Sequence, residues 1–196
     1  MGATCRLLRV GSTFALRAMH SEMIETADEH MRAKRHEDAL TAYQAAWSQL
    51  QDELTEAQRV WLLLSIANAA LRFGDFEEAF SALSVLPEHY AESGMVVGNP
   101  LFHLLVGLSY HGLNENSDGE TDNLARALIC GGPEIFSGED PSHLKRMMKI
   151  LRPPAELGTW AGYTGCSRDL LNEATGYLRD LLTERIGLPP PYASPN

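Results

Sequence analysis

A set of small residues at a fixed spacing constrains the fold of this chain more than any other sequence feature. Ala27, Ala67 and Gly107 lie 40 residues apart, each inside an apolar segment with helical periodicity. Ala39 and Ala79 follow the first two after twelve residues, in the similar phrases HEDALTAYQAA and FEEAFSALSVL. Small side chains at such positions let two antiparallel helices approach closely, while a larger residue fills the remaining gap. The spacing therefore predicts repeated helix-turn-helix units.

Capping signals predict where four helices begin. Each is a side chain that can accept a hydrogen bond from the first turn, followed three residues later by Glu or Gln, or directly by proline. The pairs are Thr55 with Gln58, Asp75 with Glu78, Asn99 with Pro100, and Asp140 with Pro141. Gly74, which tolerates the left-handed conformation, is expected to end the helix that begins after Thr55. No segment alternates apolar and polar residues for long enough to form a strand, so we expect an all-α fold.

The three units resemble tetratricopeptide repeats, whose pattern places Gly or Ala in the first helix and A-x3-F in the second. The best match contains Ala67, the segment Gly74-Asp75-Phe76 and Ala79. Two departures are the period of 40 residues, against a usual period of about 34, and the lack of the Trp of the first-helix motif. The resemblance covers roughly residues 21–130 and implies a solenoid of about three repeats followed by C-terminal capping helices.

Three further phrases occur in order: an NPxxH helix start, a GGxEIFxxEDPxxL segment and a PPxxxxW tail. Their residues are Asn99, Pro100 and His103; Gly131, Gly132, Glu134, Ile135, Phe136, Glu139, Asp140, Pro141 and Leu144; and Pro153, Pro154 and Trp160. This order resembles a bacterial family of tetratricopeptide-like immunity proteins of polymorphic toxin systems. The resemblance implies a protein that binds and neutralises a cognate toxin domain.

The chain is expected to divide into three parts. Residues 1–20 carry three arginines and no acid, which resembles a targeting segment; the simpler interpretation is a disordered or non-native extension. Residues 21–186 form a single α-helical domain, and its last helix carries leucines on one face that would cap the solenoid. Residues 187–196, rich in proline, are expected to form a flexible tail.

The charge distribution indicates the kind of partner. The chain has a net charge of -10, and residues 20–140 carry 21 acidic and 6 basic side chains, a net charge of -15. Nucleic acid requires the opposite sign, whereas a basic protein surface is attracted by this field. We therefore expect a basic protein partner and no nucleic acid.

Cysteine usage and hydropathy indicate the compartment. Cys5, Cys130 and Cys166 are odd in number and lack C-x-x-C spacing, which argues against a disulfide framework and a zinc ribbon. No apolar run approaches the roughly 18 residues of a membrane span. The simplest interpretation is a cytoplasmic protein that does not enter the membrane.

In the tetratricopeptide register the first helix of each unit lines a concave surface. The candidate partner-binding residues on these helices are Asp28, Met31, Trp61, Asn68, Arg72, His103 and His111. Trp61 is the strongest candidate anchor, because Trp is enriched among interface hot spots, and the alternative is that it packs between repeats. His103 and His111 share a helix face, but two histidines without a third ligand make a poor metal site. We therefore expect no metal.

A second candidate surface is an acidic loop. Its residues are Glu115, Asp118, Glu120 and Asp122, which lack the spacing of a calcium loop. Most such runs are solvated faces, and the functional alternative is a docking surface for cationic side chains. The chain contains no phosphate-binding glycine loop, no G-x-S-x-G and no H-E-x-x-H, and no nucleophile with a neighbouring base, so we expect no enzyme.

The sequence therefore predicts a cytoplasmic protein, without cofactor, that neutralises a toxin domain through an acidic helical-repeat surface. The alternative is a tetratricopeptide-type chaperone or adaptor that binds extended peptides. The chemistry of the toxin, the part of the surface that binds it and the oligomeric state stay open.

Overall fold

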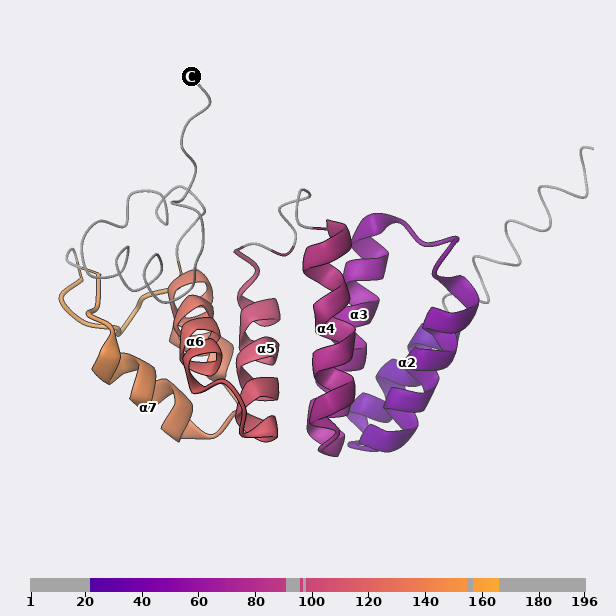
Figure 1. The fold of residues 1–196 in the computed structure, drawn as a ribbon, viewed down its shortest axis with the longest axis horizontal. Coiled ribbons are helices and arrows are strands. Elements are labelled where there is room, and N and C mark those ends of the chain that lie inside the picture. The colour runs from indigo at the N-terminus through magenta and orange to yellow at the C-terminus, as the bar shows by residue number, and fades with distance from the viewer. Residues whose placement is uncertain (1–21, 91–95, 97, 155–156, 166–196) are drawn as a thin grey trace, which may run out of the picture.

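A computed structural model of the chain describes residues 22–90, 96, 98–154 and 157–165 (Figure 1). Within these residues every regular element is a helix and none is a strand, which confirms the all-α class. Three predicted segments lie outside the described part: the extension over residues 1–20, the capping helix after residue 166 and the tail over residues 187–196. No helix within that part is both long and apolar enough to cross a membrane.

The helices stand side by side in chain order, from α2 to α7 (Figure 1). A helix over residues 22–32 comes first. It is followed by α2 (His36–Leu50), α3 (Glu56–Phe73), α4 (Phe76–Tyr90), α5 (Pro100–Leu113), α6 (Ser117–Gly131), the short 3-10 helix η2 (Pro133–Phe136) and α7 (Pro141–Ile150). From α2 to α6 each helix packs against the next, α6 packs against both η2 and α7, and α3 also packs against α5.

Three of the four predicted helix starts are confirmed in full. Thr55 forms the complete capping box: the Gln58 N–H donates to its hydroxyl oxygen, and its own N–H donates to Gln58 Oε1 at 2.9 Å. Asn99 accepts hydrogen bonds from the first turn of α5, which has Pro100 at its start. Asp140 accepts a hydrogen bond from the Ser142 N–H at 2.8 Å and begins α7.

The second predicted capping box is wrong in one half. Asp75 does accept a hydrogen bond from the Glu78 N–H at 3.0 Å, as expected. Its own N–H, however, donates to the Ala70 carbonyl at 2.9 Å, because the left-handed Gly74 (φ 97°) ends α3 by folding the chain back on its last turn. The Glu78 carboxylate is therefore free to accept a hydrogen bond from Gln44 of α2 at 2.6 Å.

The small residues lie where helices approach most closely, as the spacing predicts. Ala27, Ala39, Ala67 and Ala79 are fully buried. Gly107 of α5 faces Leu124 of α6, and a Cβ atom added to the glycine would lie 2.7 Å from Leu124 Cγ. The contact between α5 and α6 therefore requires a residue without a side chain.

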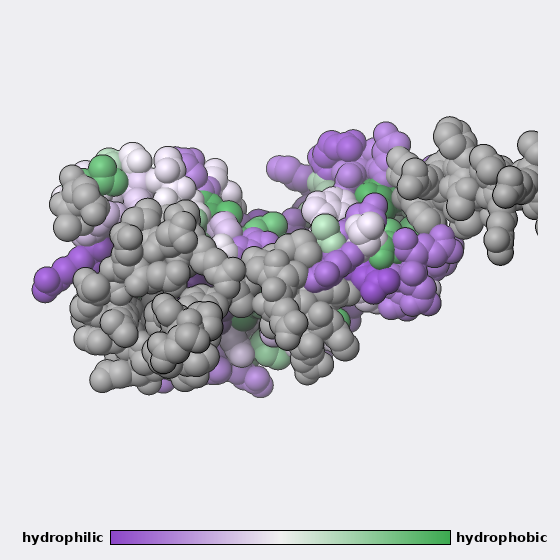
Figure 2. Space-filling view, turned by 90° about the horizontal axis from the view of Figure 1, so that it is seen from above, coloured by the Kyte–Doolittle hydropathy of each residue, from purple (hydrophilic) through white to green (hydrophobic). Residues whose placement is uncertain are grey.

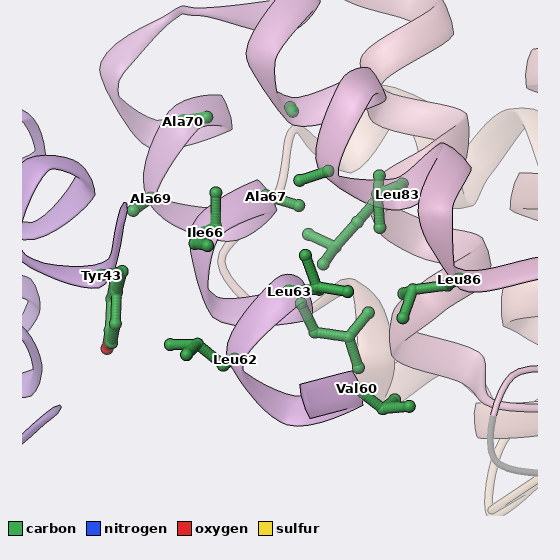
Figure 3. Packing of buried hydrophobic residues seen from close by; sticks show 14 of the residues in the cluster. Tyr43, Val60, Leu62, Leu63, Ile66, Ala67, Ala69, Ala70, Leu83 and Leu86 are labelled. Atoms are coloured by element: carbon green, nitrogen blue, oxygen red, sulfur yellow. The ribbon is translucent and has the colours of Figure 1, made fainter. Parts of the chain in front are cut away.

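The buried residues form two cores. In the first, Leu63 and Ala67 of α3 face Leu83 and Leu86 of α4, and Tyr43 of α2 lies on the other side of α3 (Figure 3). The second core joins α5, α6 and α7 to the segment over residues 157–165. Burial of each leucine in these cores contributes about 2 kcal/mol.

Candidate functional site

A buried tyrosine joins two of the predicted partner-binding residues. Tyr43 donates its hydroxyl to Asp28 Oδ1 at 2.5 Å and packs edge-on against Trp61, with 6.3 Å between the ring centroids. Burial, and then the neighbouring Asp28 carboxylate, raise the pKa of Tyr43 well above its ordinary value, so the hydroxyl remains a donor. The indole of Trp61 is supported on one side, and the residue is still 44% exposed.

The other three residues predicted near Trp61 have different surroundings. Met31 is half-buried and packs against the first core, and Asn68 is also half-buried. Arg72 donates from both terminal nitrogens to the Glu139 carboxylate, with Nη1 3.0 Å from Oε2. Glu139 lies just before α7, 67 residues further along the chain, which is why the sequence did not indicate this pair. The guanidinium of Arg72 is therefore occupied within the molecule.

Exposed apolar side chains are few in the described part. The large ones are Trp61, Phe73, Leu101 and Leu157. Seen from above, hydrophobic residues appear between hydrophilic ones, and no continuous apolar face is visible on the coloured surface (Figure 2). Trp61 is thus a local feature of a largely polar surface.

His103 does not face solvent, in contrast to its predicted place on a partner-binding surface. Only 6% of the residue is exposed, and its Nδ1 lies 3.0 Å from Asn123 Oδ1 of α6. Burial lowers the pKa of His103 to about 4, so the ring is neutral at pH 7. An amide oxygen can only accept, so the ring donates this hydrogen bond from Nδ1. Its role is to join α5 to α6.

The predicted acidic loop is wrong for three of its four residues. Helix α6 begins at Ser117, where the Asn116 side chain accepts a hydrogen bond from the Gly119 N–H, so only Glu115 precedes the helix. Glu115 and Asp118 are exposed, which suits a solvated face. The remaining two carboxylates, whose side chains are at most 10% exposed, are paired within the molecule.

Asp122 is one of these paired carboxylates. It accepts from the Arg126 Nε at 3.2 and 3.3 Å, one turn further along α6. Burial raises the pKa of Asp122 to about 6, and the opposing effect of the Arg126 charge is smaller. Asp122 therefore offers little to a cationic partner.

Glu120 is the second of these carboxylates, and it lies at the centre of a cluster of side chains from three helices. Its Oε1 accepts hydrogen bonds from His111 Nδ1 of α5, at 3.1 Å, and from Arg146 of α7. His143, at the start of α7, packs edge-on against His111, with 4.6 Å between the ring centroids. The nearest ligand atoms of His111, Glu120 and His143 all lie within 4.8 Å of one another.

The sequence indicated only part of this cluster. His111 and Glu120 were predicted as parts of two separate surfaces. The helix that carries His103 and His111 offers no third metal ligand at helical spacing. His143 was missed because its place depends on how α7 packs against α6. Burial lowers the pKa of His143, and the positive charges of His111 and Arg146 lower it further. The cluster therefore holds one buried, neutral imidazole next to a buried carboxylate.

Comparisons with known proteins give no family assignment. No protein-family model matches the chain, no curated protein matches it, and no solved structure matches it. The function must therefore be argued from the residues themselves.

Proposed function

We propose that this chain binds a folded protein partner, a toxin domain, and neutralises it. The proposal is supported by the resemblance of its motifs to immunity proteins and by one structural observation. That observation is the exposed indole of Trp61, which packs against Tyr43, the same residue whose hydroxyl bonds to Asp28. Binding hot spots are rich in Trp, and an aromatic ring that is already held in place loses little entropy on binding.

The scaffold we propose is a tetratricopeptide-like solenoid of three helix pairs. The pairs are the helix over residues 22–32 with α2, α3 with α4, and α5 with α6. Contact between α3 and α5 supports this proposal, because the first helices of adjacent repeats pack against one another in such solenoids. Full burial of Ala27 and Ala67 fits the same register.

Charge adds a second, weaker argument. The net charge of -10 would raise the association rate with a basic partner and would keep nucleic acid away. Among the acidic residues first predicted to bind, Glu115 and Asp118 are exposed and Asp28 is half-buried, whereas the side chains of Glu120 and Asp122 are at most 10% exposed and are paired within the molecule. We therefore propose that the partner contacts Trp61 and Asp28, and that the exposed Glu115 and Asp118 affect only the association rate.

The test is a binding assay with the protein encoded next to this chain's gene, produced as an isolated toxin domain. Trp61→Ala should weaken binding by about 2 kcal/mol, roughly a thirtyfold rise in Kd, as expected for a hot spot. Phe73→Ala is the matched control, because Phe73 lies on the same helix and is 48% exposed, but no aromatic ring from the described part of the chain packs against it. Equal affinity of wild type and Trp61→Ala would remove Trp61 from the interface.

Two further measurements decide the biological role. Co-expression with the toxin should let cells survive, and cells with the toxin alone should die; survival of the latter, with the toxin active, would contradict neutralisation. Binding of short synthetic peptides with an affinity equal to that of the folded domain would favour the chaperone alternative. In either outcome circular dichroism should show that the variants keep their helices.

A further inference from the structure

We propose that His111, Glu120 and His143 bind one divalent transition-metal ion, with Zn²⁺ as the ion that best suits this set of ligands. The three side chains come from α5, α6 and α7, so the ion would join three helices. Two imidazoles and a carboxylate are a common ligand set of zinc sites that keep one position open to solvent. The proposal is independent of any protein partner.

The distances suit such an ion. Zn²⁺ bonds of about 2.0–2.2 Å in a tetrahedral arrangement place ligand atoms about 3.3 Å apart. His111 Nδ1 and Glu120 Oε1 are already 3.1 Å apart. All three ligand atoms lie within 4.8 Å of one another, so the widest pair must approach by at most about 1.5 Å. A change of side-chain rotamer is enough, because the His111 side chain is 56% exposed and free to turn.

The hydrogen bonds leave donor atoms available for an ion. Both bonds to Glu120 go to Oε1, and within the described part of the chain none goes to Oε2. The ring nitrogens of His143, a residue only 7% exposed, make no hydrogen bond to any described residue. A ring nitrogen of His143 is therefore available to bind an ion. The ion would replace the proton of the hydrogen bond between His111 Nδ1 and Glu120 Oε1.

Arg146 sets the strength and the geometry of the site. Its guanidinium bonds to the Glu120 carboxylate and so holds it toward the two histidines. The same positive charge repels a cation, and we therefore expect weaker binding than at a zinc site without an arginine. The exposed edge of His111 provides the path by which the ion enters from solvent.

The test uses full-length protein without a histidine tag, treated with a chelator and then freed of it. Titration calorimetry with Zn²⁺ should show saturable binding of one ion per chain. His111→Gln should raise the Kd by at least about tenfold. The matched control is His30→Gln, which removes a histidine whose Nδ1 lies 3.9 Å from an Asp38 oxygen but which belongs to no group of three ligands among the described residues. This control should bind Zn²⁺ as the wild type does.

A second measurement separates metal binding from loss of folding. Because His111 is more than half exposed, His111→Gln should keep the helical circular dichroism spectrum of the wild type. Zn²⁺ should raise the Tm of the wild type and of His30→Gln but not that of His111→Gln. Absence of saturable binding by the wild type, or equal binding by His111→Gln, would overturn the proposal. The cluster would then be a hydrogen-bonded group of histidine, glutamate and arginine that joins the helices.

Discussion

Replacing Gly107 by alanine tests the close packing of α5 against α6. In an open helix this change stabilises a protein by about 1 kcal/mol, because alanine is the better helix former. Here the new Cβ would lie 2.7 Å from both Cγ and Cδ2 of Leu124, whereas carbon atoms prefer separations of about 3.5–4.0 Å. Leu124 is fully buried, so moving it away from the new methyl group would displace the side chains packed around it.

The net effect follows from these two opposing terms. Overpacking of a filled core costs about 1–3 kcal/mol, and the gain in helix propensity offsets about 1 kcal/mol of it, so Gly107→Ala should lower the free energy of unfolding by up to about 2 kcal/mol. Leu124→Ala alone should lower it by about 2–5 kcal/mol, because it removes a buried side chain and leaves a cavity. In that second variant the clash with the leucine side chain is gone, and only the Leu124 backbone nitrogen remains close, at 3.2 Å.

The sign of the glycine substitution should therefore reverse. Added to Leu124→Ala, the change Gly107→Ala should stabilise the protein by about 0.5–1 kcal/mol, through helix propensity and partial filling of the cavity. Urea unfolding of the wild type, the two single variants and the double variant measures all four free energies. Equal effects of Gly107→Ala in both backgrounds would refute the packing argument.

Three further predictions concern single interactions. Burial lowers the pKa of His103 to about 4, so between pH 6.5 and 4 the unfolded chain binds a proton that the folded chain does not. As the pH falls through this range, the free energy of unfolding of the wild type should thus decrease by about 1.4 kcal/mol per pH unit more than that of His103→Gln. Parallel plots of unfolding free energy against pH for the two proteins would contradict this. Tyr43→Phe should cost about 1 kcal/mol in urea unfolding and much less when Asp28→Ala has already removed the acceptor. Arg72→Ala should cost about 1 kcal/mol and speed hydrogen exchange in α7, since it leaves the Glu139 carboxylate unpaired; unchanged exchange would exclude a link to α7.

Helix boundaries were predictable because their signals are local. The Thr55 capping box and the left-handed Gly74 are formed by atoms within a few residues of each other. The burial of the small residues was predictable for a related reason, since helical periodicity places them on one face. The error at Asp75 arose because the ends of two helices compete for a single N–H, and the preceding helix uses it.

The candidate site was much less predictable, because its contacts join distant segments. Arg146 bonds to Glu120 across 26 residues and Arg72 to Glu139 across 67. One signal was present in the sequence: Glu120 lies four residues before Leu124 and therefore on its buried face. A carboxylate on the apolar face of a helix needs a partner, although the pattern does not say which one.

The ion pair between Arg72 and Glu139 restricts where helix pairs can be inserted into this molecule. Arrays of helix pairs commonly gain or lose whole units, because each unit contacts only its neighbours. Here a pair inserted between α4 and α5 would move α5, and the turn before α7 with it, away from α3 by about 8–10 Å for each added helix layer. Arg72 could then no longer reach Glu139. A single ion pair thus restricts the number of helix pairs between these two residues. Duplication of a unit there would also require loss of the Arg72–Glu139 ion pair.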